Sequence, residues 1–251
     1  MMVLFTDFGL LGPYTGQVKA VLQSAAPSVP VIDLFADAPM RNPRSAAYLL
    51  AAYALWFPAG TVLLSVVDPG VGGDRAPVIV EADGRWYVGP ENGLFEIVMR
   101  RAEAAGMAVR SWEIERQPDA PLSASFHGRD LFAPAAARVA LGATPPAAAV
   151  QEPRPPGAGR RTDWPDDLPE IVYVDHYGNA MTGLRAAALA AEAVFETPGG
   201  CRLTRARTFS DVPPGAAFWY ENSNGLAEIA VNDGRADAAL GLAVGSPVRI
   251  V

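Results

Sequence analysis

The sequence predicts an α/β protein, with an N-terminal three-layer α/β domain followed by a smaller C-terminal β-barrel domain. Over residues 1–142, short apolar runs alternate with helix-like segments, which is the pattern of strands and their covering helices. Residues 143–169 contain seven prolines and break that pattern, as a linker does. Short strand-like runs separated by Gly, Pro, Asn and Asp fill residues 170–251, a texture typical of a small barrel or sandwich. We therefore expect two domains joined by a proline-rich linker.

Hydrophobic patterning predicts the elements of the N-terminal domain. The run 61–67 (TVLLSVV) is apolar on both faces, as a buried parallel strand should be. Asp83 and Gly84 are turn residues between two apolar runs, which predicts a hairpin or adjacent strands. The predicted strands are 3–6, 29–35, 61–67, 78–82 and 85–89, and the predicted helices are 14–25, 43–57, 94–105 and 129–141.

The helical period weakens in the C-terminal domain, where the apolar runs are short and turn residues are frequent. The predicted strands there are 170–174, 193–195, 217–220, 227–231 and 247–251.

Composition excludes several classes of protein. The net charge of −7, without a basic cluster, disfavours a nucleic-acid partner, because phosphate backbones are held by Lys and Arg. Cys201 is the single cysteine, so no internal disulfide is possible. Cys201 and the two histidines, His127 and His176, cannot form a closed Cys/His zinc site, and we expect no metal. The start of the chain does not resemble a signal peptide, and no apolar run reaches about 18 residues. We expect no membrane partner and a cytoplasmic location.

Two polar segments follow predicted strands of the N-terminal domain. Asp7, in TDFG, comes directly after the first strand, where ligands of open α/β sheets bind. Its carboxylate can accept hydrogen bonds from two vicinal ribose hydroxyls. Asp68 follows the strand 61–67, and Arg75 lies seven residues further on. Neither a dinucleotide-binding nor a P-loop glycine pattern is present, and each segment can also be a simple turn.

Two more polar segments contain candidate residues. His127, in SFHGRD, precedes a predicted helix, where a lone histidine is more often a cap or a structural neighbour than a catalyst. Asp175 and Asn179, in DHYGN, follow the first strand of the second domain, and Ser223 lies in ENSNG. These last two segments are also compatible with hairpin turns. The residues alone therefore predict a polar site at strand ends and no particular reaction.

Together these segments resemble the S-adenosyl-L-methionine (SAM) hydrolase (adenosine-forming) family, also called SAM hydroxide adenosyltransferases. Fluorinating and chlorinating enzymes are relatives of that family. The matching motifs, in family order, are TDFG with PYTGQVKAV, SVVDPGVGGDR, GPENGLF, SFHGRDLFAPAAA, VDHYGN and NSNGLAEIAVNDG. The resemblance implies hydrolysis of SAM to adenosine and L-methionine without a cofactor. It also implies a homotrimer, with each site between the N-terminal domain of one subunit and the barrel of the next.

The resemblance gives each matched residue a role. Three fall on the family's hydrolytic triad: Asp68, Arg75 and His127. Four more fall on substrate-binding positions. Asp7 matches the aspartate that binds the ribose, Asp175 and Ser223 match residues that contact the methionine end, and Asn179 matches the asparagine that faces adenine. Asn92 matches an asparagine whose role we interpret as structural. Gly12 stands where relatives often carry an acidic residue, so the contact of the methionine ammonium is left open.

The triad suits this chemistry. The sulfonium leaves as a neutral thioether and needs no general acid, whereas water is a weak nucleophile. A guanidinium at Arg75 favours the ionised form of a bound water. His127 can orient that water or accept its proton, and Asp68 can orient His127 or Arg75. The alternatives are a SAM-dependent halogenase, whose halide gains nothing from an Arg–His pair, and a protein that binds SAM or adenosine without turnover. The halogenating relatives have other residues at the positions of Asp68 and His127.

Overall fold

The structure, a computed structural model, describes residues 1–115, 122–142, 153–155 and 157–251. The chain divides into two compact units, Met1–Arg161 and Thr162–Val251. The division falls inside the stretch predicted as a linker, of which residues 143–152 and 156 lie outside the described residues. Within the described part of the chain, no helix is both long and apolar enough to cross a membrane.

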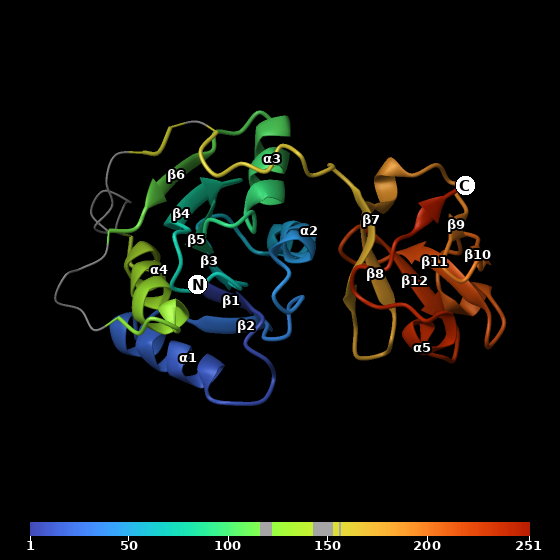
Figure 1. Cartoon of the computed structure of the whole chain (residues 1–251), viewed down its shortest axis with the longest axis horizontal. Helices are drawn as coiled ribbons and strands as arrows, with labels where there is room; N and C mark the ends of the chain where they lie inside the picture. The colour runs from blue at the N-terminus through green and yellow to red at the C-terminus, as the bar shows by residue number, and fades with distance from the viewer. Residues whose placement is uncertain (116–121, 143–152, 156) are drawn as a thin grey trace. The chain divides into compact units, whose positions relative to one another are not determined.

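A six-stranded sheet forms the centre of the first unit (Figure 1). Its order is β2-β1-β3-β5-β4-β6, with β2, β1, β3 and β5 mutually parallel and β4 antiparallel to both neighbours. The strands are β1 (Met2–Thr6), β2 (Val31–Phe35), β3 (Val62–Val66), β4 (Pro77–Ala82), β5 (Arg85–Pro90) and β6 (Arg110–Glu113). The first five were predicted. The edge strand β6 was not, because its sequence RSWE buries one side chain, Trp112.

Helices cover both faces of this sheet (Figure 1). They are α1 (Tyr14–Ala25), α2 (Pro43–Tyr53), α3 (Glu96–Ala104) and α4 (Ala133–Ala140). Apolar side chains of α1 and α4, such as Leu22 and Ala136, form one buried core with Leu4 and Leu64 of the sheet. On the other face, Phe35 packs edge-on against Tyr53 at the end of α2. The three-layer α/β domain predicted from the sequence is confirmed.

Two predicted helices have irregular ends. The segment predicted as 43–57 is α2 followed by a 3₁₀ turn at Ala54–Trp56. Asn42 caps α2, because its side chain accepts a hydrogen bond from the N–H of Ser45 at 3.0 Å. The segment predicted as 129–141 begins with a π-helical turn at Gly128–Phe132 before α4. Such turns are frequent at functional sites, and this one directly follows His127.

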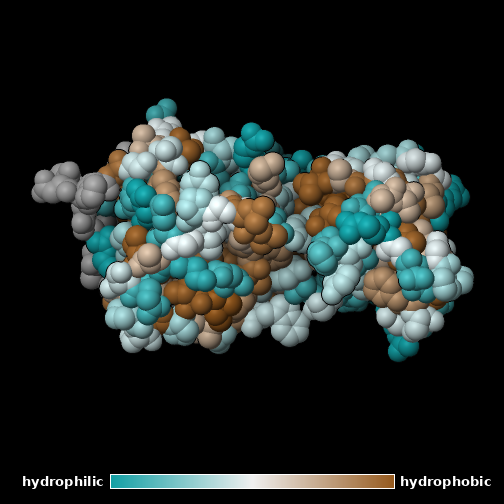
Figure 2. Space-filling view, turned by 90° about the horizontal axis from the view of Figure 1, so that it is seen from below, coloured by the Kyte–Doolittle hydropathy of each residue, from teal (hydrophilic) through white to brown (hydrophobic). Residues whose placement is uncertain are grey.

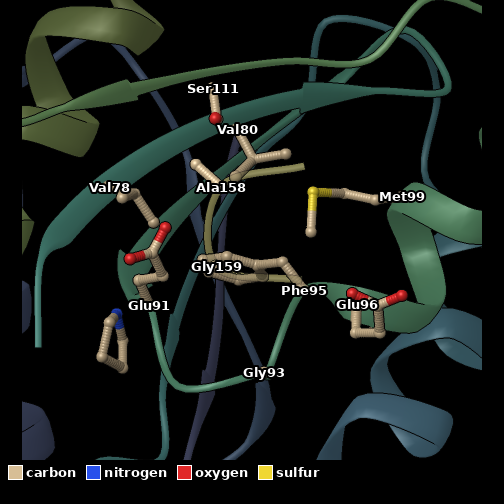
Figure 3. A pocket seen from close by; sticks show the side chains of 11 residues that line it. Val78, Val80, Glu91, Gly93, Phe95, Glu96, Met99, Ser111, Ala158 and Gly159 are labelled. Atoms are coloured by element: carbon tan, nitrogen blue, oxygen red, sulfur yellow. The ribbon is translucent and has the colours of Figure 1, made fainter. Parts of the chain in front are cut away.

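A buried carboxylate fixes the last residues of the first unit to α3. Glu96 is fully buried and accepts hydrogen bonds from the guanidinium groups of Arg100 and Arg160 and from the N–H of Arg161. Burial raises the pKa of Glu96, but these hydrogen bonds outweigh it and hold the pKa below its ordinary value. A small pocket of about 20 Å³ lies between α3, β4 and residues Ala158 and Gly159 (Figure 3).

The second unit is built from two antiparallel sheets. The first has the order β11-β12-β8-β7 and the second has the order β10-β9-β13. The strands are β7 (Leu168–Val174), β8 (Ala180–Arg185), β9 (Phe195–Glu196), β10 (Arg202–Leu203), β11 (Ala217–Glu221), β12 (Leu226–Val231) and β13 (Arg249–Ile250), and a short helix is α5 (Ala236–Leu240). Two further 3₁₀ turns span Ala186–Ala188 and Phe209–Asp211.

The predicted β-rich second domain is confirmed, but a closed barrel is not what the strands form. Within residues 162–251, all of which are described, the two sheets meet through isolated bridges, Glu170 with Pro247 and Arg205 with Trp219, rather than a continuous ladder. Phe195 stacks on Trp219 at 4.7 Å and joins the sheets in one core. Strand β8 was not predicted because it contains Gly183, where a side chain would approach Leu168 to 2.6 Å.

Candidate active site

A cleft of about 680 Å³ opens at the carboxyl ends of β1 and β3 in the first unit. Because these parallel strands are neighbours, the loops that follow them meet at one edge of the sheet. Asp7 follows β1, Asp68 follows β3, and both line the cleft together with His127. The volume lies in the range of small-ligand sites. Three of the seven residues singled out in the sequence therefore share one cavity.

Arg75 joins two of these residues. Its Nε lies 3.2 and 3.0 Å from the two carboxylate oxygens of Asp68, and its Nη2 lies 2.5 Å from Oδ2. The same Nη2 lies 2.8 Å from Nδ1 of His127. The side chains of Arg75 and Asp68 are 9% and 5% exposed, and His127 is buried. Below the guanidinium lies the ring of Phe132, 5.2 Å from the ring centre. The order is carboxylate, guanidinium, imidazole, with Arg75 in the middle.

The contact with Arg75 determines which ring nitrogen of His127 carries the proton. A guanidinium only donates, so Nδ1 must be the acceptor of the Arg75 contact. A neutral imidazole that accepts at Nδ1 carries its proton on Nε2. A second proton would have to sit on Nδ1, directly against the guanidinium, so the contact favours the neutral ring. In this state His127 offers an N–H donor from Nε2.

The guanidinium also has a donor to spare. Nη1 of Arg75 is buried and makes no hydrogen bond to any residue that the structure describes. Leaving a charged donor buried and unpaired is costly, so such groups mark places where water or a ligand is held. The carboxylate of Asp68 neutralises the positive charge of Arg75 and fixes the orientation of its guanidinium.

Glycines allow the loops to pack this closely. A side chain at Gly72, which has φ of +82°, would lie 2.7 Å from the carbonyl oxygen of Ala124. The loop between Asp68 and Arg75 thus rests directly on the backbone that leads to His127. A side chain at Gly128 would meet the ring of Phe8 at 2.8 Å. The sequence shows these glycines but not the contacts that require them.

Asn92 holds the end of β3. Its Nδ2 donates to the carbonyl oxygen of Val67 at 2.8 Å, and its Oδ1 accepts from the N–H of Leu94. Because Asp68 is the next residue after Val67, this contact fixes the start of the loop that carries the carboxylate.

Asp7 lies in the same cleft and is partly buried. Its Oδ2 accepts a hydrogen bond from the backbone N–H of Arg41 at 2.8 Å. Burial raises the pKa of Asp7 above its ordinary value, and the negative charge of Asp68 adds to this, while the Arg41 N–H and guanidinium act against it.

The other three residues lie in the second unit. Asp175 accepts hydrogen bonds from the backbone N–H and the side-chain Nδ2 of Asn179, at 2.8 and 3.0 Å, so these two are brought together at the β7–β8 turn. Ser223 lies on the turn between β11 and β12, where its Oγ accepts from Nδ2 of Asn224 at 3.3 Å.

A buried glutamate in this unit was missed in the sequence. Glu228 of β12 accepts hydrogen bonds from the hydroxyl of Tyr220 and from Nδ2 of Asn222. Burial raises its pKa, and the charge of Asp175 adds to the rise. Asn222 in turn accepts from the N–H groups of Asn224 and Leu226, and so shapes the Ser223 turn. The single acidic residue in the apolar strand LAEIAV was the available signal.

No group of three or more His, Cys, Asp or Glu side chains that could hold a metal ion occurs among the residues with described positions.

Two sequence families match this chain in succession. Residues 2–149 match the SAM hydroxide adenosyltransferase N-terminal domain, and residues 169–249 match the SAM hydroxide adenosyltransferase C-terminal domain. The chain belongs to the SAM hydroxide adenosyltransferase family. The family named from the sequence motifs is thereby confirmed.

Relatives within this family extend over nearly the whole chain. The (R)-S-adenosyl-L-methionine hydrolase of Thermus thermophilus is 43% identical over 264 aligned positions, covering 98% of this chain and 97% of the relative. The protein of the same name from Salinispora arenicola is 37% identical, covering 98% and 95%. Among solved structures, an uncharacterized conserved protein from Thermotoga maritima superposes over the full length of both chains with a TM-score of 0.86 and 30% identity.

Proposed function

We propose that this protein hydrolyses SAM to adenosine and L-methionine. The observation that carries the proposal is Arg75, held between Asp68 and His127 at the cleft and left with a buried, unpartnered Nη1 donor. The proposal is supported by relatives that bear the name of this activity and are 36–43% identical over 98% of the chain.

The reaction needs a nucleophile rather than an acid. One water loses a proton, which is released to the solvent, its oxygen forms a bond to the ribose C5′, and the C5′–S bond breaks with its electron pair passing to sulfur. The sulfonium thus leaves as the neutral thioether of methionine, and the second product is adenosine. The spare donor of Arg75 stabilises the water as hydroxide, because a nearby positive charge favours the ionised form. The remaining gain comes from in-line placement of oxygen, C5′ and sulfur, and such alignment can contribute roughly 7–11 kcal/mol.

His127 acts in this scheme as a donor. Because its Nδ1 lone pair is occupied by Arg75, the imidazole holds the water oxygen through Nε2–H rather than removing its proton. Of the two roles that the sequence left open for His127, this geometry favours orientation of the water. Asp68 orients Arg75, with which it shares hydrogen bonds to Nε and Nη2.

The substrate contacts extend to both units. Asp7 accepts hydrogen bonds from the ribose hydroxyls, and its position in the triad's cleft supports this role. Asp175 and Ser223 contact the methionine end and Asn179 faces adenine, as the family resemblance implies. The reaction as written uses water and SAM and calls for no cofactor.

We further propose a homotrimer in which the second unit of a neighbouring subunit completes each cleft. Exposed apolar side chains of the first unit support this: Met40, which lines the cleft, is 69% exposed, and Leu10 and Leu11 of the loop after β1 are 76% and 91% exposed. Apolar groups are also visible on the face of the first unit shown in Figure 2. Large exposed apolar residues of this kind mark interaction sites.

Mixed trimers test the shared site. The Arg75→Ala and Asn179→Ala chains are each inactive in this scheme, but random mixing of the two should restore about a quarter of the sites, since each site combines two neighbouring subunits. Activity that stays at the level of the separate variants after mixing places the whole site within one chain.

Product analysis tests the reaction. The purified protein is incubated with SAM in halide-free buffer, and the products are separated by chromatography, with Arg75→Ala as the control. We expect adenosine and methionine in equal amounts from the native chain. In a second arm, added fluoride or chloride should leave the product unchanged. A 5′-halo-adenosine would make the protein a halogenase, and binding of SAM without turnover would make it a binding protein.

A further inference from the structure

The loop before α2 brings a second arginine to the cleft. Arg41 lines the same cavity as Asp7 and Asp68, and its own side chain is exposed. Its backbone N–H donates to Oδ2 of Asp7 at 2.8 Å. Among the residues that the structure describes, no hydrogen-bond or ion-pair partner is found for its guanidinium. This cation therefore faces the cleft unneutralised, unlike Arg75.

The backbone of Arg41 is held in an unusual conformation. Its φ is +55°, in the left-handed region that a bulky side chain seldom adopts. Hydrogen bonds on both sides enforce it: Ala38 N–H donates to the carbonyl of Thr6 at the end of β1, and Asn42 N–H donates to the carbonyl of Pro39. Strain of this kind persists where the surrounding structure imposes it, often at functional sites. Here it turns the Arg41 N–H toward Asp7.

Asp7 needs such help because its surroundings oppose its negative charge. Its carboxylate is partly buried and lies near the carboxylate of Asp68. Asp68 is already paired with Arg75, and the other charged group in the cleft, Arg129, is paired with Asp130 and bound to Gln17. His127, from the loop before α4, is neutral in the arrangement derived above. Arg41 is the cation whose charge acts on Asp7 against burial.

We propose that Arg41 is a positioning residue that keeps the Asp7 carboxylate ionised and aimed at a vicinal diol. An ionised carboxylate accepts hydrogen bonds from both hydroxyls, whereas a protonated one must use part of its capacity as a donor. The backbone N–H fixes one oxygen, and the guanidinium supplies the charge. The inference rests on the proposed function only in taking a ribose as the diol.

Binding of adenosine and 2′-deoxyadenosine to the intact protein tests this role without requiring turnover. Calorimetric Kd values are measured from pH 4.5 to 8 for the native chain, Arg41→Gln and Arg41→Lys. Both substitutions keep the backbone N–H, but only lysine keeps the charge. Arg110→Gln, which removes the charge of an arginine paired with Glu81 outside the cleft, is the matched control.

Adenosine binding weakens as the pH falls and Asp7 is protonated. In Arg41→Gln this weakening should begin roughly half to one pH unit higher, which makes the Kd 3- to 10-fold weaker in the acidic part of the curve. Arg41→Lys and Arg110→Gln should follow the native curve. For Arg41→Gln at acidic pH, the preference for adenosine over 2′-deoxyadenosine should shrink together with the affinity. All variants keep the backbone N–H of residue 41. A substitution that merely disturbed the local structure would lower the affinity for adenosine by the same factor at every pH, whereas loss of the charge lowers it only on the acidic side.

A native-like pH curve for Arg41→Gln overturns the inference, and so does an equal shift for Arg41→Lys. Neither result touches the proposed hydrolysis, which product analysis measures separately. Conversely, a protein that binds adenosine with the expected pH shift but releases no adenosine from SAM would remove the proposed reaction and leave the role of Arg41 intact. Failure of the native protein to prefer adenosine over 2′-deoxyadenosine also overturns the inference.

Discussion

Replacing Arg75 by lysine separates charge from geometry at the centre of the cleft. Lysine keeps a positive charge beside Asp68, so no carboxylate is left buried without a partner, a defect that otherwise costs about 3–5 kcal/mol. The planar fork is lost, however. Arg75 makes contacts to Asp68 through Nε and Nη2, a contact to His127 through Nη2, and keeps Nη1 unused. A single ammonium cannot reach both neighbours in that geometry and also present a fixed donor.

The expected loss in kcat follows from the unused Nη1 donor of Arg75. Loss of one preorganised donor to a reacting oxygen costs about 10²–10³-fold in kcat. We therefore expect Arg75→Lys to lower kcat by about 10²-fold or more with KM little changed, because the hydroxide is stabilised after SAM has bound. Adenosine release in a single turnover, followed by chromatography, measures the chemical step. Arg110→Lys, at an arginine paired with Glu81 on the surface, is the matched control.

A kcat for Arg75→Lys within threefold of the native value would refute the donor geometry, since charge alone would then suffice. A loss that appears in KM and leaves kcat unchanged would assign Arg75 to substrate binding instead.

Four further substitutions address the remaining contacts. His127→Ala should retain ligand binding and lose about 10²-fold or more in turnover, because it removes the N–H donor that orients the attacking water; kcat measured beside a direct Kd checks this. Asp7→Ala should instead raise KM and the Kd for adenosine, because its hydrogen bonds to the ribose exist before the reaction; an unchanged Kd would remove it from the site. Gly72→Ala should destabilise the protein by about 1–3 kcal/mol in denaturant unfolding, because its side chain would collide with the carbonyl of Ala124. The pKa of Glu96 is lower in the folded protein than in the unfolded chain, where it is about 4.5. Ionised Glu96 therefore stabilises the fold above pH 4.5, and this stabilisation is lost as the pH falls through the pKa of the folded state. Glu96→Gln should therefore be less stable than the native chain at neutral pH, and this difference should narrow in acid; a difference independent of pH would contradict the buried ion pairs.

Much of the fold was readable in the sequence because hydrophobic period determines it. Helix α1 spans Tyr14–Ala25, the range predicted, and the apolar run of β3 is buried throughout. What was missed lacks such a signal. The edge strand β6 is polar, and β8 contains a glycine required by a close contact rather than by strand propensity. The two-sheet arrangement of the second unit depends on which strand edges meet, and strand patterns alone do not specify this.

Four of the residues singled out in the sequence lie together in the structure, but the sequence did not predict how they contact one another. Strand ends indicated Asp7 and Asp68, and motif resemblance added Arg75 and His127. The sequence could not tell whether Asp68 orients the imidazole or the guanidinium, because that depends on how three distant loops pack. The close contact between Gly72 and the backbone of Ala124 is part of that packing, and no local pattern encodes it. The role of Arg41 was hidden for the same reason, since a positive φ at arginine has no sequence signature.

Isotope labelling of the solvent tests the central claim most directly. Hydrolysis of SAM in H₂¹⁸O, followed by mass spectrometry of both products, reports where the water oxygen goes. Attack at C5′ should place one ¹⁸O in the 5′-hydroxyl of adenosine and none in methionine. Adenosine without the label, or label found in the methionine product, would contradict a water molecule attacking the ribose carbon.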